Sequence, residues 1–294
     1  MQRVPTFIEH QFAQKLPHPS MTTRFRVGAA LLVLASCASA FTLAPAKPLP
    51  AKVQTPTFRL RGGDDASASM LTSVGAGVFA ASGAMAWIAP KKTLGSYGVP
   101  EDLSSTSMMR TQGLFQLCLA ATLLAGKHGS VFASGFGLLA TGLTCLMNIP
   151  IWDQIQREKP SQVAGVAVFA LLGKLTLDGR ISAKVAGYLP LLLGLLIHFT
   201  PVATAKLYQL AEPISKAGLS MLALYGSMIS LVGVYLGSLA YGLALPQAFA
   251  ATFAVNGAFA LKWALTEAKS LGAPMAGGLV WAALSAAMSA LALK

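Results

Sequence analysis

Long apolar stretches with almost no charge dominate the chain after residue 63 and constrain its fold more than any other feature. They are continuous rather than alternating, and continuous apolar runs of this length are typical of helices that lie in lipid. The stretches cover residues 70–89, 111–125, 131–149, 162–177, 185–199, 217–245, 249–265 and 273–293. The sequence therefore predicts an all-α, polytopic transmembrane bundle of about eight spans, or seven if the fourth stretch lies in the interface.

The composition supports a membrane location for residues 64–294. Charged residues make up 11% of the chain, whereas soluble domains average about 25%, and the mean hydropathy is +0.62. Residues 1–63 hold eight basic side chains and one acid, so +7 of the net charge of +12 lies there and +5 lies in the remainder. No basic run with interleaved aromatic residues occurs in that remainder, so nucleic acid is not a predicted partner.

Motifs of enzymes and metal sites are missing from the sequence. The three cysteines, Cys37, Cys118 and Cys145, show no Cys-x-x-Cys spacing, and buried apolar packing is the expected role of the last two. There is no His-Glu-x-x-His, no Gly-x-Ser-x-Gly and no Gly-x-x-x-x-Gly-Lys-Ser/Thr motif. We therefore expect no catalytic residues, no metal and no cofactor, and an intramembrane enzyme is the least favoured class.

The N-terminal region has the composition of a removable leader. In residues 21–40, Arg24 and Arg26 precede a short apolar run, and Ala38-Ser39-Ala40 is a typical small-residue cleavage site for a signal peptide. Residues 41–63 are basic and contain no acid, as in a transit peptide. Residues 1–20 are interpreted as an over-extended N-terminus before an initiating Met21, or else as a long n-region.

The junction Ala38-Ser39-Ala40-Phe41-Thr42-Leu43-Ala44-Pro45 resembles the ASAFAP motif. That motif marks bipartite plastid presequences in algae with red-lineage secondary plastids, such as diatoms. The resemblance covers residues 21–63 and implies that the exposed Phe41 directs the chain from the ER to a plastid membrane, envelope or thylakoid. An ordinary secreted leader with a polar spacer is the alternative interpretation.

The membrane part shows signs of an internal duplication. Pro90, Tyr97 and Glu101 recur 111 residues later as Pro201, Tyr208 and Glu212, and Gly83 recurs at the same offset as Gly194. Gly113 has a match in Gly218, and Thr144-x-x-x-Asn148 recurs as Thr252-x-x-x-Asn256. These landmarks predict two tandem four-helix halves, residues 70–180 and 181–294. Halves with an even number of spans enter the membrane from the same side and form a parallel repeat.

Four polar side chains within the apolar stretches are candidates for a solute path. Asn148 and Asn256 are the two asparagines of the chain, and a buried amide without a partner is costly. They are expected either to face each other across a central crevice or to form interhelical hydrogen bonds. Gln112 and Gln116 are four residues apart and therefore lie on one helix face.

The remaining polar landmarks are expected at helix ends. Tyr97 and Tyr208 fit interfacial anchors, and Glu101 and Glu212 are predicted to cap the helices that follow them. His198 is expected at the interface, and Lys262, with Glu267 five residues later, is expected to extend toward water. Gly233 and Gly237 form a Gly-x-x-x-Gly pair, for which internal packing is favoured over a dimer.

Two functions remain open from the sequence. The first is a small-solute transporter or channel whose path follows the boundary between the halves and passes both asparagines. The second is a non-catalytic scaffold or assembly subunit of a plastid complex, with a closed apolar boundary between the halves. The expected partners are accordingly the lipid bilayer and either a small solute or other plastid membrane proteins.

Overall fold

The structure, a computed structural model, describes residues 65–156, 160–211 and 213–294. The predicted N-terminal extension, signal peptide and transit peptide in residues 1–63 lie outside the described residues, as does Glu212. No β-strand occurs in the described ranges, and an isolated antiparallel bridge joins Gln156 to Leu210. The prediction of an all-helical protein is therefore confirmed for this part of the chain.

Each predicted apolar stretch coincides with a long helix. The long helices are α2 (Asp65–Ile88), α4 (Leu103–Ala125), α5 (Ser130–Trp152), α6 (Pro160–Leu177), α7 (Ala183–Phe199), α9 (Lys216–Ala240), α10 (Leu245–Lys262) and α12 (Ala276–Ala292). Short elements connect them: α3 (Pro90–Ser96), η1 (Gly126–His128), α8 (Pro201–Leu207), the π-helical η2 (Trp263–Ala268) and α11 (Lys269–Leu271).

Length and apolar composition allow four of the described helices to cross a membrane, and five if a bent pair counts as one span. The four candidates are Ser69–Ile88, Ser130–Trp152, Lys216–Ala240 and Leu245–Leu271. The bent pair consists of α7 and α8, whose axes meet at 107°. Val163–Leu177 and α12 are shorter apolar helices. The chain is therefore a helical protein with several candidate spans.

Two prolines open short helices that share one backbone geometry. Pro90 and Pro201 begin α3 and α8, at a position where proline is favoured because its missing N–H would have no partner there. The residue before each proline has nearly the same dihedral angles, φ −125° and ψ 56° at Ala89, and φ −128° and ψ 52° at Thr200. After the short helices, Gly98 and Gln209 have left-handed φ values of 65° and 53°.

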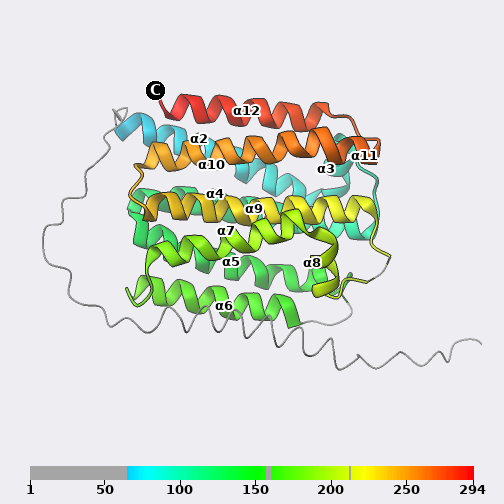
Figure 1. Ribbon diagram of the computed structural model, residues 1–294, viewed down its shortest axis with the longest axis horizontal. Helices are drawn as coiled ribbons and strands as arrows, with labels where there is room; N and C mark the ends of the chain where they lie inside the picture. Colours follow the sequence, from blue (N-terminus) through cyan, green and yellow to red (C-terminus); the bar gives the residue numbers. More distant parts are fainter. Residues whose placement is uncertain (1–64, 157–159, 212) are drawn as a thin grey trace, which may run out of the picture. The chain divides into compact units, whose positions relative to one another are not determined.

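Helices α4 and α9 lie side by side in the middle of the bundle and run in the same direction (Figure 1). At their N-termini the hydroxyls of Ser104 and Ser215 are 3.2 Å apart. At their C-termini the Tyr235 hydroxyl donates to the Leu123 carbonyl at 2.9 Å. Helix α2 packs on α4 and α7 on α9, while α5 pairs with α6 and α10 with α12.

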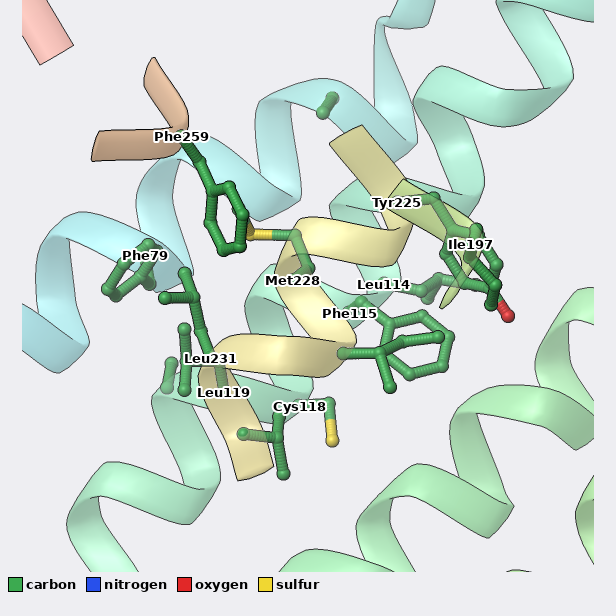
Figure 2. Close-up of a cluster of buried hydrophobic side chains, with 14 of the residues drawn as sticks. Phe79, Leu114, Phe115, Cys118, Leu119, Ile197, Tyr225, Met228, Leu231 and Phe259 are labelled. Atoms are coloured by element: carbon green, nitrogen blue, oxygen red, sulfur yellow. The ribbon is translucent and has the colours of Figure 1, made fainter. Parts of the chain in front are cut away.

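The core between these helices is filled by large apolar side chains. Figure 2 shows Leu119 of α4 and Leu231 of α9 in the same cluster, and Met228 directed toward the ring of Phe259. The rings of Phe115 and Tyr225 meet edge to face, with centroids 5.0 Å apart. The α4–α9 contact is therefore closed and apolar along its middle.

Glycines allow the closest helix contacts. A Cβ on Gly83 would lie 2.7 Å from the Gly113 carbonyl oxygen, and one on Gly194 would lie 2.6 Å from the Gly226 carbonyl oxygen. Gly218, the predicted match of Gly113, faces Ser104, whereas Gly226 faces Gly194 of α7 as Gly113 faces Gly83 of α2.

The Gly-x-x-x-Gly pair of α9 also serves packing within the chain. A Cβ on Gly233 would lie 2.2 Å from the Leu191 amide nitrogen, and one on Gly187 would lie 2.5 Å from the Gly237 amide nitrogen. Both contacts join α9 to α7, as expected for internal packing rather than a dimer contact.

Candidate functional site

A cavity of about 300 Å³ lies between α2, α3, α4, α9, α10, η2 and α12. Along α2 it extends from Phe79 to Ala86, a distance of about 10 Å at 1.5 Å per residue. Lys92 and Ser96 of α3 line it and are exposed, so that end reaches the surface. The lining also contains aromatic rings and four methionines, namely Phe79, Tyr97, Phe259, Trp263, Trp281, Met85, Met109, Met221 and Met228.

Three of the four predicted path residues line this cavity. Gln112 and Gln116 come from one face of α4, and Asn256 comes from α10. The two glutamines are 9% and 7% exposed, and neither side-chain carbonyl oxygen has a hydrogen-bond partner among the described residues. Buried polar atoms are nearly always paired in folded proteins. The two carbonyl oxygens therefore have hydrogen-bonding capacity that no described side chain or backbone group uses.

The two asparagines have different surroundings. Asn256 donates from Nδ2 to the Ser285 hydroxyl of α12 at 2.9 Å. Asn148 is fully buried in α5, does not line the cavity, and has no hydrogen-bond partner for either amide atom among the described residues. The helix continues through Pro150 to Trp152, which places Asn148 inside α5 rather than at its end. The two asparagines therefore do not share this cavity.

Aromatic side chains line the end of the cavity next to α3. The Trp281 indole donates to the Tyr97 hydroxyl at 2.6 Å, and Tyr97 meets Trp263 edge to face at 6.1 Å between ring centroids. Burial raises the pKa of the Tyr97 phenol, so this hydroxyl stays protonated at neutral pH. Lys92 is the one charged side chain among the described lining residues, and none of them carries a carboxylate.

A polar network lies directly behind Trp263. The Trp263 indole donates to the Ser220 hydroxyl at 3.0 Å, and Ser220 donates to Glu267 Oε2 at 2.7 Å. Lys262 Nζ forms an ion pair with Glu267 Oε1 at 2.7 Å. Lys262 is therefore paired within the chain rather than free to extend to water. The π-helical turn η2 carries both Trp263 and Glu267, and such turns are frequent at functional sites.

His198 is buried, with 2% of its surface exposed, so the expectation of an interfacial histidine is wrong. Its Nδ1 lies 2.8 Å from the Ser227 hydroxyl and 3.0 Å from the Ala223 carbonyl oxygen. Ser227 itself lines the cavity. The burial of His198 could not be predicted from the sequence, because it depends on the packing of α7 against α9.

The repeat landmarks pair with tryptophans that the sequence analysis did not single out. Tyr208 meets Trp152 edge to face at 5.4 Å, as Tyr97 meets Trp263. The Trp152 indole donates to Thr111 of α4 at 2.9 Å, as the Trp263 indole donates to Ser220 of α9. Trp152 and Trp263 are separated by the same 111 residues as the two tyrosines, a spacing that would have found them.

At α4, helix capping differs from the prediction by one residue. Asp102, not Glu101, caps α4 by accepting from the Ser105 amide at 2.8 Å, and Ser215 caps α9. Burial acts to raise the pKa of the Asp102 carboxyl. Hydrogen bonds from Ser104, Ser215 and Ser105 outweigh it, so the pKa lies below its ordinary value.

Within the described residues, no three His, Cys, Asp or Glu side chains form a group that could hold a metal ion. No protein-family model matches the chain, and no curated protein or solved structure matches it. The side chains that line the cavity are therefore the basis for inferring what it binds.

Proposed function

We propose that the chain is an integral plastid-membrane protein of eight spans that binds and moves a small solute through the cavity beside Gln112, Gln116 and Asn256. The observation that carries this proposal is that Gln112 and Gln116 line a cavity open at α3, and that their side-chain carbonyl oxygens have no hydrogen-bond partner among the described residues. Binding sites are typically apolar concavities with a few polar groups that fix the ligand.

The proposal of eight spans adds α4, α6 and α12 to the five candidates. Helix α4 has 23 residues, long enough to span, and its serines, threonines and glutamines are largely buried by neighbouring helices. Helix α12 has 17 residues, about 26 Å, against a hydrocarbon layer of about 30 Å. Because α6 pairs with α5 and α12 with α10, both would lie at the same depth as helices that are candidate spans.

Two tandem halves are supported by repeated contacts. When the short elements η1, η2 and α11 are left out, the order long, short, long, long, long occurs twice along the chain, in α2 to α6 and in α7 to α12. Gly83 meets Gly113 as Gly194 meets Gly226, and the tyrosine after each short helix packs on a tryptophan of the other half. Parallel α4 and α9 fit a pseudo-two-fold axis along the membrane normal.

The halves differ at the place where the cavity lies. If Gly113 corresponds to Gly226, then Gln112 corresponds to Tyr225 and Met228 corresponds to Phe115. In the second half Tyr225 fills the space with edge contacts to Phe115 at 5.0 Å and to Trp152 at 5.9 Å. One ligand site per chain follows, beside α4 rather than on the axis between the halves.

Proteoliposomes containing the full chain test the transport proposal. Flux of glycerol, glucose, urea, glucosamine and phosphate is compared with empty liposomes, in a Cys37→Ser background where Cys118 and Cys145 are buried. Ser82→Cys lines the cavity, so its modification by a bulky thiol reagent is expected to block the flux. Gly77→Cys in the same helix faces open space and serves as the control. A panel in which no solute moves faster than in empty liposomes would refute the proposal.

A scaffold or assembly subunit of a plastid complex is the second candidate. The closed apolar contact between α4 and α9, with Phe115 and Tyr225 at its middle, favours it, because a path along the axis is excluded there. This function predicts a native assembly much larger than the 30.4 kDa chain, unchanged in size by Gln112→Leu. A chain that migrates alone after mild solubilisation would contradict it.

The plastid location rests on the leader sequence. A fluorescent fusion of the full chain, expressed in a diatom, is expected to reach the plastid, and Phe41→Ala is expected to hold it at the ER. Equal delivery of both versions would remove the support that Phe41 gives to this location.

A further inference from the structure

The cavity wall narrows the class of ligand it can accept. Of the described lining residues, none is acidic and one, Lys92, is basic and exposed at the outer end. A cationic ligand would therefore lose its hydration without meeting a carboxylate, and the interior offers no positive side chain to an anion. An uncharged ligand meets neither cost.

The ligand also has to bring hydrogen-bond donors. The carbonyl oxygens of Gln112 and Gln116 are buried and unpaired, and a hydrocarbon in the cavity would leave both without a partner. Each unpaired carbonyl would lower affinity by at least about fivefold. The two glutamines are one helical turn apart, about 5–6 Å between their Cβ atoms. Hydroxyls on opposite sides of a six-membered ring are separated by a comparable distance.

Aromatic rings supply another part of the lining. Trp263 and Trp281 both contact Tyr97, and Phe79 stacks on Trp281 with centroids 6.4 Å apart. Such flat faces pack against the C–H faces of a saturated ring, while the carboxamide of Asn256 adds a further polar group. A volume of about 300 Å³ is at the lower end for ligand sites, which suits one ring.

We infer that the cavity ligand is an uncharged polyhydroxyl molecule with one six-membered ring, a monosaccharide or cyclitol, held between the two glutamines and the aromatic rings. This inference rests on the proposed function, since it names the solute class of the same site. The glutamine carbonyls accept ligand hydroxyls, the glutamine amides donate to ligand oxygens, and the two indole rings cover its apolar faces.

The test measures binding to the full chain in detergent by the change in tryptophan fluorescence, with glucose and myo-inositol as probes. Saturable binding of a neutral probe is expected, tighter than that of glucosamine or glucose 6-phosphate. Gln112→Leu/Gln116→Leu is expected to raise the dissociation constant of glucose by at least about tenfold. Met288→Leu, an apolar exchange at a buried position of α12 outside the cavity lining, is expected to leave it within about twofold.

A ligand series tests the donor requirement without changing the protein. On the unaltered chain, trans-1,4-cyclohexanediol is expected to bind about fivefold more tightly than cyclohexanol, because it supplies a second hydroxyl. Equal binding of the two, unchanged affinity in the glutamine variant, or tighter binding of a charged analogue would overturn the inference. Flux of glucosamine or phosphate alone would keep the transport proposal and refute the ligand class. Glucose binding without any flux would keep the ligand class and refute the transport proposal.

Discussion

Replacing glycine at a helix contact by alanine is the sharpest test of the packing between α7 and α9. A Cβ on Gly194 would lie 2.3 Å from the Ser230 amide nitrogen and 2.6 Å from the Gly226 carbonyl oxygen. Both opposing atoms belong to the backbone, so no side-chain rotation relieves the overlap. The Gly194→Ala variant has to separate the two helices instead.

The size of the effect follows from two opposing terms. Inserting a methyl group into a filled contact costs about 1–3 kcal/mol, and alanine gains about 1 kcal/mol over glycine in a helix. Because the overlap is with backbone, the upper part of the first range applies, and the net loss is about 1–2 kcal/mol. For a chain of this size that lowers the unfolding midpoint by about 2–8 °C.

The assay is thermal unfolding of the purified full chain in detergent, followed by the loss of monodisperse protein. Gly83→Ala, which overlaps the Gly113 carbonyl oxygen at 2.7 Å, is expected to lose stability in the same way. Gly77→Ala and Gly237→Ala face open space and are expected to be unchanged or more stable. If Gly194→Ala were as stable as these two controls, the close contact between α7 and α9 would be refuted.

Three further variants probe the helix cap, the ion pair and the fully buried asparagine. Asp102→Ala is expected to cost about 0.5–2 kcal/mol of stability. Because the folded pKa of Asp102 lies below its ordinary value, the stabilisation by its charge is present above about pH 4 and is lost as the pH falls through the folded pKa. A pH series of unfolding midpoints, compared with Asp102→Asn, would show this loss. Lys262→Met leaves Glu267 without its cation and is expected to lower stability by about 1–3 kcal/mol. The double variant Lys262→Met/Glu267→Gln is expected to recover part of that loss. A double variant no more stable than the single one would contradict the pairing. Asn148→Leu removes two buried polar atoms without a partner and is expected to be neutral or stabilising; a loss above about 2 kcal/mol, measured by the same unfolding assay, would instead point to an essential polar contact.

Local sequence signals predicted the helices well because membrane-type helices satisfy their own backbone hydrogen bonds. Pro90 and Pro201 marked the ends of α2 and α7 correctly, since the chain has to leave the helix before a proline that opens the next one. The shared face of Gln112 and Gln116 also followed from the helical period alone.

Features that depend on tertiary packing could not be read in the same way. Asn148 lies inside α5 because the helix continues through Pro150. Trp263, seven residues after Asn256, begins a π-helical turn that no sequence period indicates. His198 is buried because α9 supplies Ser227 and Ala223 beside it and α10 supplies the ring of Phe259. The cavity lies beside Gln112 of α4, whereas the bulkier Tyr225 of α9 packs against Trp152.

Cysteine accessibility from the two sides of a sealed membrane tests the central claim, an eight-span bundle with parallel halves, most directly. Single cysteines are placed at Ser96, Lys206 and Ser270 in one set, and at Gly129, Gly179 and Gly242 in the other, in a Cys37→Ser background. The account predicts that an impermeant reagent labels the first set from one side only and the second set from the other. Labelling of Ser96→Cys and Gly129→Cys from the same side would mean that α4 does not cross the membrane, and the eight-span account would fail.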